Sequence, residues 1–248
     1  MSAHHELQAQ RYELKFIVPE SLRTSIRAFV ASYLELDEYA QDDYSYAIHS
    51  IYLDSPRLDM YHATLNGDRN RYKLRIRYYN DDANTPTFLE TKRKVSDVVQ
   101  KQRCLVSRAS LPQVLAGDTS LIKPGSIKDQ MTFCHLMHQA NATPRAHVGY
   151  LREAWVSRHD NSIRVTMDRD VRVEPRFDLR LGTAMDNPVT VFPGQIVLEL
   201  KYTNRYPAWF RDIVQNFNLM QCGAAKYAGG IMLYGEQRYL RAPELNFV

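Results

Sequence analysis

Basic residues stand at every second position in several segments of the chain. In the segment 71–79, Arg71, Lys73, Arg75 and Arg77 alternate with Tyr, Leu and Ile. In an extended strand alternate side chains share one face, so these cations form a row. Neighbouring like charges repel one another unless an anion neutralises them. The spacing therefore predicts that this face binds a polyanion, and guanidinium groups bind phosphate oxygens bidentately.

A few carboxylates fall on the same predicted strand faces as the cations. The pairs are Glu90 with Lys92, Glu199 with Lys201, and Asp168 with Arg164. For any one strand, a solvated face with no function is the favoured explanation of such charges, because solvated sheet faces are common. For the whole set we favour an interior, because the opposite faces are rich in Leu, Ile, Tyr, Phe and Val. An interior lined with Lys, Arg and a few carboxylates needs a polyanion and a divalent cation, a combination suited to phosphoryl transfer.

Other catalytic motifs do not occur in the sequence. There is no G-x-S-x-G, no H-E-x-x-H and no G-x-x-x-x-G-K-[ST]. Cys134, His135 and His138 lack the second Cys/His pair that a structural zinc site needs, so we interpret them as helix or loop residues. Tyr52 and Asp54 are candidates for supporting the charged face, although a simple strand-end cap explains Asp54 equally well.

Period-two segments alternate with helical segments along the chain. This pattern predicts an α+β, mainly antiparallel β fold of about eight strands with peripheral helices, and if the helices cover the outside of a closed sheet, the strands form a barrel with its charged faces inward. The expected strands are 11–18, 49–54, 71–79, 87–95, 98–107, 148–158, 162–174 and 195–202. The expected helices lie within 19–37, 121–141, 206–219 and 226–238. We expect a flexible N-terminus at 1–10, a single domain over 11–240 and a C-terminal tail at 241–248.

Composition limits the class of protein. The 248 residues are 44% hydrophobic and 24% charged, which is typical of a globular chain and argues against disorder. No apolar run approaches the ~20 residues of a membrane span, and the start of the chain does not resemble a signal peptide. We therefore expect a cytoplasmic protein. The net charge of +4 is modest, so the placement of the charges matters more than their sum.

An ordered series of motifs resembles the VTC (vacuolar transporter chaperone) polyphosphate polymerase domain of the triphosphate tunnel metalloenzyme (CYTH-like) superfamily. Each motif is weak alone, and the specific signal is that eight occur in this order. They are YELK at 12–15, SIYLD at 50–54, KLRIRY at 73–78, ETK at 90–92, YLREA at 150–154, RVTMD at 164–168, ELK at 199–201 and KY at 226–227. The resemblance covers 11–234, nearly the whole chain.

The resemblance implies an eight-stranded closed tunnel barrel with peripheral helices, and it implies residue roles within that fold. Arg75 and Arg77 look like the central phosphate clamp, and Lys226 looks like the lysine that closes on the terminal phosphate. With Glu199 they form the implied catalytic set. The implied phosphate-binding residues are Lys15, Lys73, Arg75, Arg77, Lys92, Lys101, Arg103, Arg152, Arg164, Lys201 and Lys226, with Lys101 and Arg103 competing for one position. The implied ligands of Mn²⁺ or Mg²⁺ are Glu199, Asp168 and Glu90.

The implied reaction is transfer of the ATP γ-phosphate to phosphate or to a growing polyphosphate chain. The hydrolase and cyclase branch of the superfamily begins with E-x-E-x-K, whereas Arg11 stands at the first of these positions here, which favours the VTC-like branch. A triphosphatase and a non-catalytic polyphosphate-binding module are the alternatives. Expected partners are ATP and pyrophosphate or polyphosphate, with a membrane protein as a candidate for recruitment. No nucleic acid is expected, because the charges alternate with buried-type residues rather than with exposed aromatics.

Overall fold

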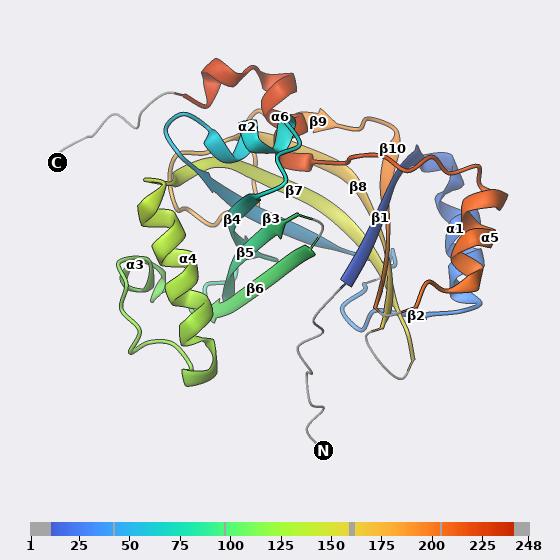
Figure 1. Ribbon diagram of the computed structural model, residues 1–248, viewed down its shortest axis with the longest axis horizontal. Helices are drawn as coiled ribbons and strands as arrows, with labels where there is room; N and C mark the ends of the chain where they lie inside the picture. The colour runs from blue at the N-terminus through green and yellow to red at the C-terminus, as the bar shows by residue number, and fades with distance from the viewer. Residues whose placement is uncertain (1–10, 42, 97, 159–161, 204, 241–248) are drawn as a thin grey trace. The chain divides into compact units, whose positions relative to one another are not determined.

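The computed structural model describes residues 11–240 except 42, 97, 159–161 and 204 (Figure 1). The chain divides into two compact units, and three strands run through both. The first unit comprises the described residues of Met1–Tyr46, Arg152–Arg169 and Gly194–Ala224, and the second those of Ala47–Leu151, Asp170–Pro193 and Ala225–Val248. The expected flexible N-terminus, 1–10, and tail, 241–248, lie outside the described residues.

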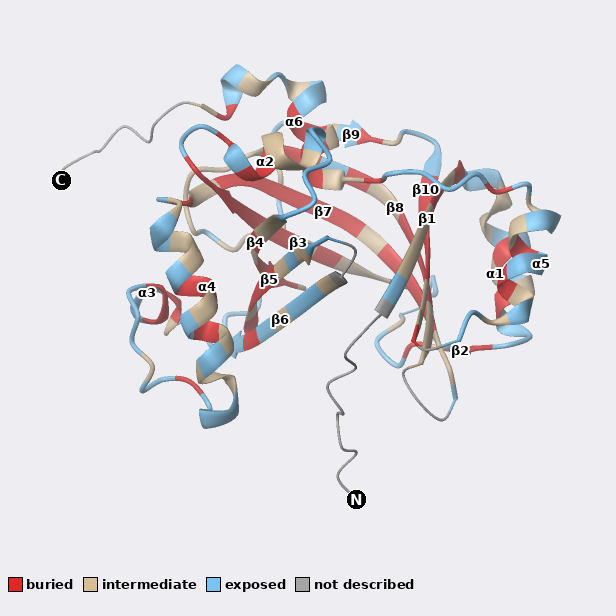
Figure 2. Cartoon of the chain, viewed as in Figure 1, coloured by how far each residue is buried: buried red, intermediate tan, exposed pale blue. Residues whose placement is uncertain are grey.

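The first unit is a sheet with two helices against its apolar face. Its strands follow the order β1-β10-β8-β7, and a short β2 pairs with β7. On that face Phe16 of β1 and Leu198 of β10 pack with Ile26 of α1 and Phe210 of α5. The bounds are β1 Arg11–Pro19, η1 Glu20–Leu22, α1 Arg23–Ala31, β2 Glu35–Leu36, β7 Thr143–Val156, β8 Ile163–Pro175, β10 Gln195–Thr203 and α5 Ala208–Asn216. The charged residues of the same strands lie on the opposite face. Figure 2 shows the buried residues of this unit in red, in its strands as well as in α1 and α5.

The second unit contains a sheet in the order β7-β3-β4-β5-β6, with β9 paired to β8. Leu74 and Ile76 of β4 and Leu89 of β5 form a core with Phe133 and Cys134, which lie in α4 as the sequence indicates. The bounds are β3 Ser45–Asp54, α2 Asp59–Leu65, β4 Arg71–Tyr78, β5 Thr87–Val95, β6 Val98–Val106, α3 Leu111–Leu115, η2 Pro124–Ser126, α4 Ile127–Gln139, β9 Val189–Val191, α6 Lys226–Tyr234 and η3 Glu236–Arg238. Here too the buried Leu74, Ile76 and Leu89 occupy one face, and Arg75, Arg77 and Glu90 lie on the other.

The mainly antiparallel β architecture with peripheral helices is confirmed, but the expected closure of the barrel is wrong. The hydrogen-bonded path of strands begins at β1 and ends at β6, and no ladder joins these two strands among the described residues. Alternation of side chains determines which residues share a face of a sheet. Closure depends instead on hydrogen bonds between the first and last strands, on which the alternation carries no information. Within the described residues, no helix is long and apolar enough to cross a membrane.

Candidate functional site

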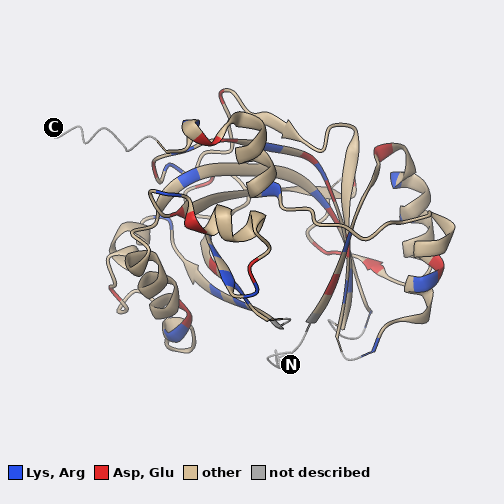
Figure 3. Cartoon of the chain, turned by 45° about the horizontal axis from the view of Figure 1, so that its top comes forward, with Lys and Arg blue, Asp and Glu red and all other residues tan. Residues whose placement is uncertain are grey.

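The register of β3 to β6 brings the predicted cations of the second unit into rows across the strands. Arg75 pairs with Tyr52 on one side and with Glu90 on the other, and Glu90 pairs in turn with Arg103. A second row crosses the same strands, with Lys92 between Lys73 and Lys101. Directly opposed residues on neighbouring strands have Cβ atoms about 5 Å apart. The structure therefore gathers residues far apart in sequence on one basic face (Figure 3).

Glu90 is the counter-ion that these cations share, and its side chain is 1% accessible. Its Oε2 accepts a 2.7 Å hydrogen bond from Arg75 Nε and lies 3.7 Å from Arg77 Nε. Its Oε1 lies 2.7 Å from Lys101 Nζ and 3.2 Å from Arg103 Nε. Burial opposes ionisation of Glu90, but the four cations outweigh burial and hold its pKa well below the usual value. One carboxylate thus balances several partly buried cations, which leaves this face strongly positive.

Arg77 is the more buried of the two clamp residues, Arg75 and Arg77, and its side chain is 7% accessible. Its Nη2 donates a 3.2 Å hydrogen bond to the hydroxyl of Tyr150. Its Nε is fully buried and makes no hydrogen bond among the described residues, and 3.7 Å separates it from Glu90. A buried donor without a hydrogen bond is costly, so an incoming phosphate oxygen would satisfy a group that the protein leaves unmatched.

Lys226 is the first residue of α6, and its ammonium group lies 4.9 Å from the centre of the Tyr150 ring. Tyr150 therefore contacts two predicted phosphate ligands, Arg77 through its hydroxyl and Lys226 through its ring. Tyr150 is not among the site residues predicted from the sequence. The available signal was its position two residues before Arg152 in one strand, which places both on the same face.

The first unit contains a second charged cluster around Glu199, which is 4% accessible. Its carboxylate lies 3.4 Å from Lys15 Nζ, 2.5 Å from Lys201 Nζ and 3.6 Å from Arg152 Nη2, and it accepts a 3.2 Å hydrogen bond from the hydroxyl of Thr166. The strand register explains this gathering, because Lys15 and Thr166 are the direct partners of Glu199 on β1 and β8. Unlike the cluster around Glu90, this one carries carboxylates and cations in comparable number.

Burial affects the two lysines of this cluster differently. For Lys15, burial favours the neutral form, but the nearby Glu199 and Glu13 outweigh it and raise the pKa. For Lys201, burial prevails over the same carboxylates, Arg152 adds to its effect, and the pKa falls to about 8. Lys201 is therefore close to losing its charge under mildly alkaline conditions, whereas Lys15 is firmly cationic.

The remaining predicted residues of this unit pair with acidic side chains. Arg152 forms a bidentate pair with Asp168, with hydrogen bonds of 2.6 and 2.7 Å, and Asp168 is fully buried. Arg164 donates to Asp37 at 2.5 Å and to the hydroxyl of Tyr46 at 3.3 Å. Phosphate binding by Arg152 and Arg164 therefore stays a prediction, as does metal binding by Asp168.

The predicted metal ligands do not by themselves form a metal site. No group of three His, Cys, Asp or Glu residues able to hold an ion occurs among the residues that the structure describes. Glu199, Asp168 and Glu90 each contact lysine or arginine side chains, whose charge repels a cation. A site that holds Mg²⁺ commonly uses only one or two carboxylates and completes its shell with substrate phosphates and water. Each of these carboxylates therefore fits a metal site only where substrate phosphates and water supply the other ligands.

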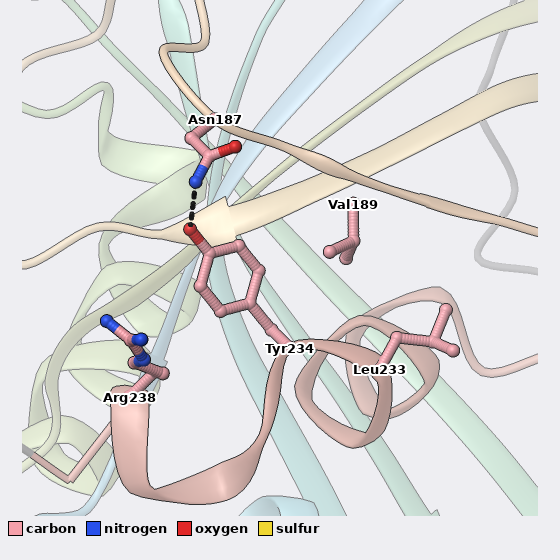
Figure 4. Close-up of a pocket in the computed structure, with 5 residues that line it drawn as sticks. All are labelled: Asn187, Val189, Leu233, Tyr234 and Arg238. Carbon is pink, nitrogen blue, oxygen red and sulfur yellow. Dashed lines mark hydrogen bonds between the residues drawn. The ribbon is translucent and has the colours of Figure 1, made fainter.

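A cavity of about 230 Å³ lies elsewhere in the second unit (Figure 4). Val189, Leu233 and Arg238 line it, together with Tyr234 and Asn187, whose side-chain amide donates a 3.1 Å hydrogen bond to the Tyr234 hydroxyl. None of the predicted site residues lines this cavity. It offers a single cation, so it is not suited to a polyanion.

Comparison with solved structures supports the fold. A putative adenylate cyclase from Bacillus halodurans matches with a TM-score of 0.51 and 10% identity, covering 87% of this chain and 94% of that one. A protein from Pyrococcus horikoshii OT3 matches with a TM-score of 0.44 and 13% identity, covering 90% and 99%. At this identity the first likeness shows the fold alone.

Sequence comparison identifies the family. A search of curated proteins finds no match. The family model of the VTC domain matches residues 10–234, which include both charged clusters and the first turn of α6. The chain therefore belongs to the VTC domain family.

Proposed function

We propose that this protein is a polyphosphate polymerase that transfers the γ-phosphate of ATP to phosphate or to a growing polyphosphate chain. The observation that carries the proposal is the cluster around Glu90, where four cations from β4 and β6 share one buried carboxylate. Cations that outnumber their carboxylate in this way, two of them largely buried, are stabilised by a polyanion. Membership of the VTC domain family supports a protein that handles polyphosphate or triphosphate.

In the proposed reaction, Arg75 and Arg77 bind oxygens of the nucleotide triphosphate. Arg77 Nε, which makes no hydrogen bond in the described structure, gains one to a phosphate oxygen. Lys226 contributes a further positive charge from the start of α6. An oxygen of the acceptor phosphate attacks the γ-phosphorus, the bond to the β-γ bridging oxygen breaks, and ADP leaves. Phosphoryl transfer relies mainly on positioning and charge stabilisation, so no side-chain nucleophile is required.

The proposal includes Mn²⁺ or Mg²⁺ as a cofactor, with Glu199 as the protein ligand. When bound, such an ion would neutralise charge on phosphate oxygens. Asp168 and Glu90 are weaker candidates as ligands, because Arg152 engages both carboxylate oxygens of Asp168 and four cations surround Glu90. The proposed location is the cytoplasm, and a membrane protein is the proposed partner for recruitment.

The test is incubation of the purified protein with ATP and Mn²⁺, with and without pyrophosphate, followed by phosphorus NMR and a gel stained for polyphosphate. Long chains with a matching amount of ADP support the proposal. Free phosphate without chains would show a triphosphatase instead, and bound but unchanged ATP would show a binding module. Arg93→Ala is a matched control for variants of the clamp. Arg93 is exposed, and its side chain lies on the opposite face of β5 from Glu90 and Lys92.

A further inference from the structure

The first two residues of α6 each reach one arginine of the clamp through a tyrosine. Lys226 lies over the ring of Tyr150, whose hydroxyl accepts a hydrogen bond from Arg77. The ring of Tyr227 stacks on that of Tyr52, with 4.8 Å between centroids and 5° between planes. The hydroxyl of Tyr52 in turn accepts a 2.9 Å hydrogen bond from Arg75 Nη1.

Tyr227 is itself fixed on its far side. Its hydroxyl donates a 2.8 Å hydrogen bond to Asp54, which is fully buried at the end of β3. The same carboxylate accepts backbone N–H bonds from Met60 and Tyr61 in the first turn of α2, both at 2.9 Å. Asp54 therefore accepts hydrogen bonds from the first turn of α2 and anchors Tyr227 of α6.

We propose that Tyr52 and Tyr227 are positioning residues that hold the guanidinium group of Arg75 ready for phosphate. Glu90 and Tyr52 together engage all three nitrogens of this guanidinium. Arg75 is thereby held in one orientation before the ligand arrives. A long side chain that is already ordered loses less conformational entropy on binding, so affinity rises without a new contact to the ligand. The inference rests on the proposed phosphate-binding function of this face.

The charges around Tyr52 predict that polyanion affinity depends on pH, which provides a specific test of the proposal. Lys73, Arg75 and Arg77 lie near it on β4, Glu90 balances them from β5, Tyr227 faces it from α6, and Asp54 follows on its own strand. Burial opposes ionisation of the Tyr52 phenol, but the cations outweigh burial and lower its pKa to about 8. A bound polyanion neutralises those cations, so its binding must raise this pKa. By linkage, polyanion affinity falls as pH rises through the ionisation of Tyr52.

The experiment measures binding of inorganic tripolyphosphate to the full chain by calorimetry, for the wild type and for three variants. Tyr52→Phe keeps the stacked ring but removes the hydroxyl that binds Arg75, so we expect affinity to fall by about tenfold, the effect of one hydrogen bond to a charged group. Tyr227→Leu removes the stack, and we expect a smaller loss. Tyr202→Phe is the matched control, because Tyr202 stacks on Tyr12 at 5.1 Å on the apolar face of the first unit.

The second readout is the pH dependence. Between about pH 7 and about pH 9 the affinity of the wild type should fall, because Lys101, whose pKa burial lowers to about 7, loses its charge in the lower part of this range and Tyr52 ionises near pH 8. Tyr52→Phe should abolish the part of the fall that follows the ionisation of Tyr52, and the part caused by Lys101 should persist. Absorbance of the phenolate in the apo protein should show one tyrosine that titrates below the others and is missing in Tyr52→Phe. Equal affinity and an equal pH profile in Tyr52→Phe and wild type would overturn the inference. If the wild type itself fails to bind tripolyphosphate, the proposed function fails instead, which separates the two.

Discussion

Replacing Glu90 by Gln tests whether the cations of β4 and β6 need a negative charge, from Glu90 or from a bound polyanion, to be stable in the fold. The substitution keeps the size of the side chain but removes the negative charge shared by Arg75, Arg77, Lys101 and Arg103. The cations then repel one another without compensation. We expect the apo protein to lose stability and bound polyanion to restore it.

The magnitude follows from the accessibility of the partners. Removing one partner of a buried ion pair costs about 3–5 kcal/mol, whereas an exposed pair contributes about 0–1 kcal/mol. Arg75 and Arg77 are 19% and 7% accessible, so their contacts with Glu90 count as buried ion pairs. Lys101 and Arg103 are 46% and 38% accessible, so their contacts with Glu90 resemble exposed pairs. We therefore expect a loss of about 3 kcal/mol. For a chain of this size, that corresponds to a fall in Tm of roughly 6–12 °C.

Thermal unfolding monitored by circular dichroism is the assay, with and without tripolyphosphate. Tripolyphosphate should raise the Tm of Glu90→Gln more than that of the wild type. The control is Glu35→Gln, whose partner Arg158 forms an exposed ion pair with it, and it should unfold close to the wild-type temperature. An unchanged Tm for Glu90→Gln, or an equal tripolyphosphate shift in both proteins, would refute the reasoning.

The same carboxylate predicts a pH dependence. Because the folded-state pKa of Glu90 lies well below the unfolded value, its contribution to stability is complete above the usual glutamate pKa. The contribution is lost as pH falls through the folded-state pKa. Acidification below about pH 4.5 should therefore destabilise the wild type more than Glu90→Gln. Parallel acid unfolding curves for the two proteins would contradict this assignment.

Three further outcomes follow from the same structure. Arg75→Ala combined with Arg77→Ala should abolish ATP binding measured by calorimetry while leaving the circular dichroism spectrum unchanged. Glu199→Gln should retain most phosphate affinity but lose Mn²⁺-dependent turnover in the polyphosphate assay. Gly230→Ala should destabilise the protein by about 1–3 kcal/mol in thermal unfolding, because its Cβ would lie 2.3–2.7 Å from side-chain atoms of Val173.

Each of these outcomes has a control or a contrary result. Arg93→Ala should bind ATP like the wild type, and unchanged affinity in the double arginine variant would remove the clamp assignment. Full turnover in Glu199→Gln would show that Glu199 is not the metal ligand. Gly125→Ala should leave stability nearly unchanged, since nothing lies within 4 Å of its added Cβ.

The sequence by itself determined which residues share a strand face. The alternation in 71–78 and 87–95 is a local property of the extended backbone, so it separated Arg75, Arg77 and Glu90 from their apolar neighbours without knowledge of the fold. The helices at the surface were also predictable from their spacing. Their ends were less so, because the helix expected over 19–37 ends at Ala31 and the chain then turns into β2.

Only the tertiary structure decided how these faces are paired and balanced. Strand register made Glu90 the partner of Arg75 and Arg103, and made Glu199 the partner of Lys15. The contacts of Tyr150 and Tyr227 join segments far apart in sequence, so the strand pattern could place Tyr150 on the face of Arg152 but could not give the partners of either tyrosine. The predicted closure of the barrel was wrong for the same reason. Side-chain periodicity is set residue by residue, whereas pairing and closure depend on hydrogen bonds between distant strands.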